Sequence, residues 1–147
     1  MPRYVILEHR WNGVHFDFMV ENMGPDNLLR TWAIDVEAFP KFVPGFILRA
    51  RALPDHRRAY LDFEGEVSGG RGVVTRWDEG TCEVEHWSDH RVRLILAGRQ
   101  LEGPVELGVS GGSTGGSEIA AGACGSDSAS TAGGGSTVWF FRFGKLR

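Results

Sequence analysis

The sequence predicts a mainly β protein, an antiparallel sandwich or barrel with little helix. Apolar and polar residues alternate over short runs, most clearly at 14–21, which is the period-two pattern of a half-buried strand. Turn residues such as Asn12-Gly13 and Gly24-Pro25-Asp26 separate these runs. Almost no segment has the 3.6-residue period of an amphipathic helix. Many short strands divided by turns are typical of sandwiches and barrels, and closure of the sheet would protect its edges.

The first half of the chain begins with a predicted β-meander, in which strands at 3–9, 15–21 and 28–34 follow one another through tight turns. Residues 35–44 are interrupted by proline and leave room for only a short helix at 36–39. Beyond them we expect a strand at 46–53, a turn at 54–58 and an alternating strand at 59–67.

The second half continues the series, with strands expected at 73–78, 81–87, 91–96 and 101–109, the first two separated by a turn at Glu79-Gly80. Residues 110–136 consist almost entirely of Gly, Ser, Ala and Thr, and predict a disordered insertion. The apolar segment 137–143 is then expected to return as the last strand and to pair with residues 104–109. We therefore interpret residues 1–147 as one domain.

Composition narrows the classes of protein. The net charge of −3 argues against a protein that coats nucleic acid unselectively, because such proteins carry a strongly basic surface. No apolar run approaches the ~20 residues that span a bilayer, and the start of the chain does not resemble a signal peptide. The two cysteines, Cys82 and Cys124, lie far apart, which is typical of reduced thiols and predicts a cytoplasmic protein.

The strongest candidate site consists of His9, His15 and Asp17. The predicted hairpin places the two histidines on neighbouring strands, and Asp17 shares a strand face with His15. Two imidazoles and a carboxylate form a three-ligand set for Mn²⁺, Zn²⁺ or Fe²⁺, with positions left for water or substrate. The alternative from spacing alone is that these side chains only form hydrogen bonds on an exposed strand face.

Other polar groups are weaker candidates. Arginines cluster around residues 54–56 and predict either a solvated loop or an anion-binding patch; they are Arg49, Arg51, Arg57 and Arg58. His56 and Tyr60 alone are typical of a surface, as are His86 and His90. The glycine-rich segment 68–72 could cradle a phosphate, but it lacks the lysine and following helix of a P-loop.

Several motifs occur in the order found in one known family. His9 is followed, after five residues, by the run 15–21, where the family has His-Tyr-Asp-Phe-Arg-Leu-Glu. Residues 29–34 match a Leu-Lys-Ser-Trp-Ala-Val segment, and residues 55–65 match Asp-His-Pro-Leu-Asp-Tyr-Leu-Asp-Phe-Glu-Gly. A Trp-Asp-x-Gly-Thr turn, a glycine-bearing hairpin and an aromatic last strand follow. The chain thus resembles the 3'-phosphoesterase domain of bacterial DNA ligase D, in a small free-standing form.

The resemblance implies a compact antiparallel β-barrel and a Mn²⁺-dependent enzyme of DNA repair and end joining. Such an enzyme trims 3'-ribonucleotide or 3'-phosphate ends of DNA or RNA–DNA, as a monomer, with a separate ligase or polymerase as a further partner and no membrane. The residues matching the family's metal ligands are His9, His15 and Asp17. His56 and Tyr60 match residues that contact the scissile phosphate, and Arg30 stands at a basic position of the family.

The chain departs from the family pattern at three positions: Met19 replaces an arginine, Leu7 replaces a glutamine and Pro54 replaces an acidic residue. A thioether cannot neutralise a phosphate. Two functions therefore stay open, a metal-dependent 3'-phosphoesterase and a metal- or phosphate-binding module that recognises nucleic-acid ends or a repair protein. An arginine beside Met19, supplied by Arg30, Arg49 or Arg51, would favour the enzyme.

Overall fold

The computed structural model describes residues 1–22, 24–36, 46–109 and 137–144. Strands make up most of this part of the chain, with one 3₁₀ helix, η1 (Arg58–Leu61). The strands are β1 (Arg3–Arg10), β2 (Val14–Glu21), β3 (Leu28–Ile34), β4 (Ile47–Arg57), β5 (Gly65–Glu66), β6 (Val73–Trp87), β7 (Arg91–Gly98), β8 (Glu102–Val109) and β10 (Trp139–Phe143).

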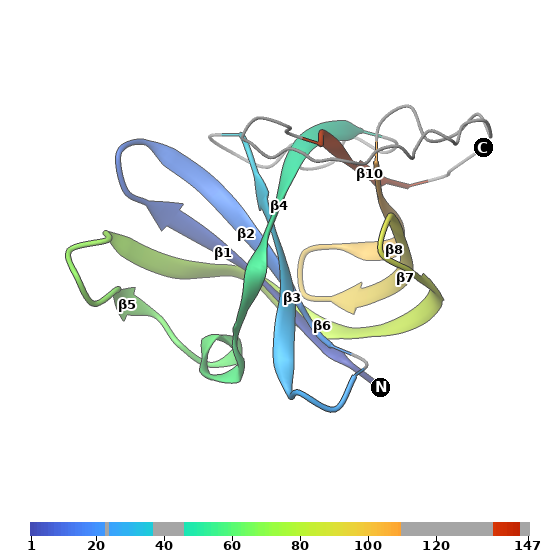
Figure 1. Ribbon diagram of the computed structural model, residues 1–147, viewed down its shortest axis with the longest axis horizontal. Coiled ribbons are helices and arrows are strands. Elements are labelled where there is room, and N and C mark those ends of the chain that lie inside the picture. Colours follow the sequence, from blue (N-terminus) through green and yellow to red (C-terminus); the bar gives the residue numbers. More distant parts are fainter. Residues whose placement is uncertain (23, 37–45, 110–136, 145–147) are drawn as a thin grey trace.

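The strands form one antiparallel sheet that closes into a ring of eight. Their order is β1-β2-β3-β4-β10-β8-β7-β6-β5, and β1 also pairs with β6, which closes the ring and leaves β5 as a short branch beside β6 (Figure 1). The β1–β2 hairpin projects at one end of the molecule, next to the start of β6. The predicted β class is confirmed, and closure leaves the ring itself without open edges.

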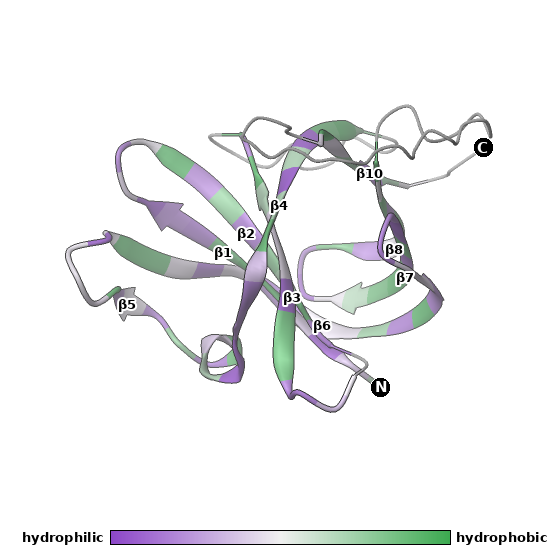
Figure 2. Cartoon of the chain, viewed as in Figure 1, coloured by the Kyte–Doolittle hydropathy of each residue, from purple (hydrophilic) through white to green (hydrophobic). Residues whose placement is uncertain are grey.

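The interior of the ring holds the main hydrophobic core. Alternate residues along each strand belong to this core, among them Phe16, Phe18 and Val20 of β2. Figure 2 shows the matching alternation of hydrophobic and hydrophilic residues along β2. Aromatic rings of four strands meet there, and Phe18 lies 5.5 Å from Phe141 and 6.1 Å from Trp32, centroid to centroid. Edge-on and tilted packing of this kind adds to the stabilisation that burial of the rings provides.

A second, smaller apolar cluster lies on the opposite faces of β1, β2 and β3. Its buried members are Val5, Leu7, Met19, Leu29, Leu61, Val67 and Val74, and Tyr60 and Phe63 pack against it. We call this group the outer cluster. Leu61, from η1, is 1% exposed, so the 3₁₀ helix covers the sheet here and is held by apolar burial. The outer face of these strands is therefore buried where the outer cluster lies and polar beyond it.

One buried carboxylate ties β6 to the turn between β7 and β8. Asp78 is fully buried, and Tyr4 Oη donates a 2.6 Å hydrogen bond to its Oδ2. The backbone N–H groups of Gln100 and Leu101 donate to the same carboxylate at 2.7 and 3.2 Å. The turn and β1 are thus fixed to the middle of β6 through hydrogen bonds to one buried carboxylate.

The predictions for the hairpins are confirmed. Asn12 and Gly13 form the β1–β2 turn with φ angles of 55° and 112°, the left-handed conformation that these residue types tolerate best. The last strand pairs with β8 as expected, with Trp139 opposite Val109. The insertion predicted at 110–136 and most of the short helix predicted at 36–39 lie outside the described residues.

Three boundary predictions are wrong. The turn expected at 54–58 is the end of β4, which runs to Arg57 because Leu28 and Leu29 of β3 continue to pair with it. The strand expected at 59–67 is η1 followed by the two-residue β5. The two strands separated at Glu79-Gly80 are one strand, β6, whose first half pairs with β1 and whose second half pairs with β7.

Gly80 explains the continuity of β6, because a Cβ atom there would lie 2.2 Å from the carbonyl oxygen of Ala97. The glycine permits a close approach of two strands where the sequence indicated a turn. Within the described residues, no helix is both long and apolar enough to cross a membrane.

Candidate functional site

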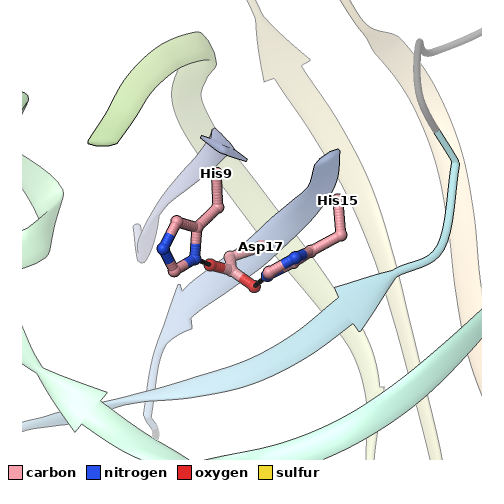
Figure 3. A group of neighbouring side chains, drawn as sticks. All are labelled: His9, His15 and Asp17. Carbon is pink, nitrogen blue, oxygen red and sulfur yellow. Dashed lines mark ion pairs between the residues drawn. The ribbon is translucent and has the colours of Figure 1, made fainter. Parts of the chain in front are cut away.

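His9, His15 and Asp17 meet on the outer face of the β1–β2 hairpin. His9 of β1 is paired with His15 of β2, and Asp17 follows two residues later on the same strand face. His9 Nδ1 lies 3.3 Å from Asp17 Oδ2, and His15 Nε2 lies 3.0 Å from Asp17 Oδ1. Figure 3 shows the two imidazoles on either side of the carboxylate. One potential ligand atom from each residue falls within 4.8 Å of the others.

The orientation of the His9 ring is fixed by a backbone carbonyl on the side away from Asp17. Its Nε2 lies 2.7 Å from the carbonyl oxygen of Arg71, which can only accept, so Nε2 carries a proton and donates it. In the neutral ring, Nδ1 is then the unprotonated nitrogen, and it faces Asp17. A backbone carbonyl that sets the tautomer of a ligand histidine is a common feature of metal sites.

Asp17 is the most buried member of the site, at 4% exposed. Burial acts to raise the pKa of its carboxyl, but His15 and His9 act in the other direction and hold the pKa below its usual value. The hydrogen bond to Asp17 raises the pKa of His9 against the effect of burial. The carboxylate is therefore the charged form at neutral pH.

The same carboxylate has an unused acceptor. Oδ1 of Asp17 is buried without a hydrogen-bond partner among the described residues, although His15 Nε2 lies 3.0 Å from it. This buried, charged oxygen lies beside His15 Nε2, and His9 Nδ1 faces the other oxygen of the same carboxylate. The arrangement fits a divalent cation, which would supply the missing interaction. The residues present thus suit a metal ion held by His9 Nδ1, His15 Nε2 and Asp17.

A cavity of about 540 Å³ opens over this group. Strands β1 to β4 and the segment between β5 and β6 contribute to its wall. The lining residues are His9, Trp11, Asn12, Val14, His15, Asp17, Ala33, Asp35, Arg51, Leu53, His56 and Arg71. A space of this size is in the usual range for a small-molecule or nucleotide site, and much larger than a single ion needs.

His56 reaches the cavity from the end of β4. Its Nδ1 donates a 2.8 Å hydrogen bond to the carbonyl oxygen of Pro54, which leaves Nε2 as the ring nitrogen that can meet a substrate. Tyr60 of η1 lies next to it, with ring centroids 5.7 Å apart, but lines a separate hollow of about 160 Å³ with Phe63. His56 thus lines the same cavity as the candidate metal ligands, whereas Tyr60 contacts His56 but lines a different one.

Two arginines line the cavity. Arg51 of β4 donates to Asp35 through Nε and Nη2 at 3.0 to 3.3 Å, and these bonds raise its pKa. Arg71 is the residue whose carbonyl holds His9, and its Nε donates to the carbonyl oxygen of Ser68 at 2.8 Å. That bond occupies only Nε, so the terminal nitrogens of Arg71 can turn to a ligand.

A comparison with known proteins assigns the chain to the family that the sequence motifs resemble. Residues 7–108 match the model of one protein family, described as the DNA ligase D 3'-phosphoesterase domain. The chain belongs to that family. A search of curated proteins finds no match. The match includes the candidate metal ligands and both cavity arginines, which lie at positions 9–17, 51 and 71.

Arg30 does not reach the cavity in this member of the phosphoesterase family. Its guanidinium lies 5.0 Å from the ring centroid of Trp32, 5.3 Å from that of Trp87 and 5.8 Å from that of Trp139. One terminal nitrogen also donates to the carbonyl oxygen of Asp89 at 3.2 Å. Arg30 therefore faces the interior side of β3, where cation–π contacts hold it.

Met19, at the family's arginine position, points to the outer cluster. Its side chain is 1% exposed and packs among Leu7, Leu29 and Leu61. None of the three arginines suggested by the sequence is shown beside it: Arg51 lines the cavity, Arg30 lies among tryptophans and Arg49 is exposed on β4. The space is occupied by packed apolar groups, so position 19 has a structural role in this chain.

Sequence reasoning did not name four polar or aromatic residues of the cavity wall as candidates: Trp11, Asn12, Asp35 and Arg71. Trp11 and Asn12 belong to the hairpin turn that the sequence did predict. Arg71 is a single cation in a glycine-rich loop, and its place next to His9 depends on pairing between β1 and β6, which no local pattern encodes.

Proposed function

We propose that the protein is a metal-dependent phosphoesterase that trims 3'-phosphate or 3'-ribonucleotide ends of DNA. The observation that carries the proposal is the buried Asp17 carboxylate, which lies between His9 and His15 and opens to the same cavity as His56 and two arginines. Membership of the phosphoesterase family supports it. In a repair pathway, the resulting 3'-hydroxyl would serve a separate ligase or polymerase.

Each residue has a part that its position suits. A divalent ion held by His9, His15 and Asp17, such as Mn²⁺, would polarise a phosphoryl oxygen and lower the pKa of a bound water. Arg71 offers terminal nitrogens to the remaining phosphate oxygens. His56 presents Nε2 to the same space and is the candidate for moving a proton at the ester oxygen. Tyr60 supports the ring of His56 from the side.

The test is hydrolysis of primer-templates that end in a 3'-phosphate or a 3'-ribonucleotide, with Mn²⁺ and with EDTA. We expect turnover only with the metal, and at least ~100-fold slower turnover for Asp17→Asn and His15→Ala, because a metal contributes several kcal/mol to such reactions. His90→Ala is the matched control, since His90 lines a different cavity. Equal activity of Asp17→Asn and the wild type would disprove the proposal.

A second function, an end-binding module without turnover, is favoured by one observation. Met19 occupies the position of the family's arginine and is packed into the outer cluster, while Arg51 is already paired with Asp35. Such a module would bind a 3'-phosphorylated oligonucleotide more tightly than a 3'-hydroxyl one, with Mn²⁺ and without product. Product formation that depends on Asp17 would exclude it.

A further inference from the structure

Trp11 is an exposed aromatic residue at the mouth of the candidate site. It lies in the β1–β2 turn, is 45% exposed and lines the cavity together with His9 and Asp17. Single exposed apolar side chains are common on protein surfaces, so the position of Trp11 over the cavity, and not its exposure, is what points to a ligand. Of the other exposed large apolar residues in the described ranges, Met1, Ile47 and Val73, none lines this cavity.

The indole of Trp11 is held in place by the site itself. Its ring centroid lies 6.1 Å from that of His9, with 20° between the planes. Its backbone N–H donates a 2.9 Å hydrogen bond to the carbonyl oxygen of Gly13. Gly72 packs against the same turn, where a Cβ atom would fall 2.7 Å from Trp11 Cβ. A bound partner would therefore meet an aromatic ring that already contacts His9 and stands on a fixed backbone, which reduces the entropy cost of stacking.

The cavity has more room than a phosphate requires. Its volume of about 540 Å³ extends from the metal ligands past Trp11, and its wall carries both polar and apolar surface. A phosphate bound near Asp17 would leave space for the group that it esterifies. An aromatic face beside that space suits a nucleobase, because every base can stack on it whatever its hydrogen-bonding edge.

The charge on the neighbouring strand fits the same ligand. Arg49 and Arg51 alternate with the inward-facing Ala50, so both lie on the outer face of β4, and Arg51 lines the cavity. Arg71 adds a third cation on the other side. Because Arg51 is paired with Asp35, Arg49 and Arg71 are the cations that a phosphodiester backbone leading away from the site could meet, although the whole chain has a net charge of −3.

We propose that Trp11 is a stacking platform for the terminal nucleobase of the substrate strand. This inference rests on the proposed function and specifies its substrate as a nucleic-acid end of any base, in place of a general phosphate monoester. Trp11 takes no part in the chemistry. It acts on binding, by fixing the last nucleotide so that its 3'-phosphate lies over Asp17 and its neighbours.

The test measures binding without turnover. Fluorescence anisotropy is recorded with 5'-labelled DNA that ends in a 3'-methylenephosphonate, in which a CH₂ group replaces the bridging oxygen and prevents hydrolysis. The last residue is either thymidine or an abasic tetrahydrofuran. The proteins are the full-length wild type, Trp11→Ala and Trp11→Phe, with Mn²⁺ present, and Ile47→Ala is the control for loss of an exposed apolar residue that lies outside the cavity.

We expect Trp11→Ala to weaken binding of the thymidine end by about 10-fold or more, the usual size of one base–aromatic stack. Trp11→Phe should keep most of the affinity, and Ile47→Ala all of it. Binding of the abasic end should be the same for all four proteins. An equal loss for both ends would overturn the inference, because Trp11 would then act through His9 and the metal, and so would an unchanged affinity for the thymidine end.

Failure of the stacking proposal can be distinguished from failure of the proposed phosphoesterase function. If the wild type hydrolyses DNA that ends in a 3'-phosphate, and Trp11→Ala binds the thymidine end as tightly as the wild type does, the phosphoesterase function stands and the stacking role of Trp11 is excluded. If Trp11→Ala weakens binding of the thymidine end but not of the abasic end, and the wild type hydrolyses no 3'-phosphate, then Trp11 is a stacking platform of an end-binding module. In an active enzyme, Trp11→Ala should raise KM and leave kcat within about threefold, as expected for loss of uniform binding.

Discussion

The role of Met19 can be tested by removing its side chain. Met19→Ala deletes three methylene-sized groups from a side chain that is 1% exposed within the outer cluster. At about 0.8 kcal/mol for each buried group, the lost burial amounts to about 2.4 kcal/mol. A residual cavity adds to this, so we expect the free energy of unfolding to fall by about 3 kcal/mol. Met19→Leu keeps the volume and should lose less than about 1.5 kcal/mol.

The assay is urea unfolding followed by tryptophan fluorescence, with Mn²⁺ binding measured on the folded variants. The metal affinity of Met19→Ala should match that of the wild type, because the deleted atoms face Leu7, Leu29 and Leu61 and not the cavity. A destabilisation under about 1 kcal/mol would refute the packing argument.

Met19→Arg gives the opposite perturbation. It restores the residue type found in the family but places a guanidinium among buried aliphatic groups, so the variant should be less stable than Met19→Leu. A stable Met19→Arg protein with faster 3'-end hydrolysis would show that position 19 can serve the site, and would contradict the assignment of Met19 to the core.

Three further predictions concern the metal, a buried phenol and a buried thiol. Mn²⁺ at 100 times its Kd should stabilise the wild type by ~2.7 kcal/mol and raise its Tm by about 5–10 °C, whereas Asp17→Asn should show no shift; equal shifts would place the ion elsewhere. Burial, with the hydrogen bond to Asp78, raises the pKa of Tyr4 far above 10. Its contribution to stability is therefore complete below about pH 10 and declines above it. In Tyr60→Phe, which retains one tyrosine, absorbance at 295 nm should show tyrosinate only as the circular dichroism of the fold is lost. Burial raises the pKa of Cys82 to about 12, so in Cys124→Ser a thiol reagent at pH 8 should react only after unfolding.

The sequence predicts the hairpin and its ligands because their information is local. The period-two pattern of residues 14–21 assigns His15 and Asp17 to one face, and the Asn12-Gly13 turn sets the register that places His9 opposite His15. These two features are sufficient to bring three candidate ligands together. The same pattern assigns Met19 to that face correctly, but it cannot show that the face is polar at one end and buried at the other.

The parts that sequence reasoning missed depend on contacts between distant segments. Arg71 reaches His9 only because β1 pairs with β6, and β4 extends through His56 only because β3 continues beside it. Residues 59–67 carry an alternating pattern, yet η1 forms because Leu61 is buried in the outer cluster. Tertiary burial there outweighs a weak local preference for strand.

The outer face of β2 links the cavity to the outer cluster, because it carries His15 and Asp17 at one end and Met19 at the other. The face is open at His15 and Asp17 and closed at Met19, where η1 covers it. Arg58 pairs with Glu21 of β2, and Asn22 donates to Asp55 at 2.9 Å, so the segment on both sides of His56 is fixed to the same strand.

Apolar packing of Leu61 in the outer cluster also holds η1, which follows directly after the end of β4 that carries His56, against the sheet. A buried arginine at position 19 would have needed a charged partner under η1, and the described residues of the outer cluster are all apolar except for the phenol of Tyr60. A methionine at this position adds to the apolar packing that holds η1, and the arginines that line the cavity come from β4 and from the loop before β6, as Arg51 and Arg71. The charge near the candidate metal ligands is thus supplied from two other elements, while β2 provides the ligands and the support beneath them.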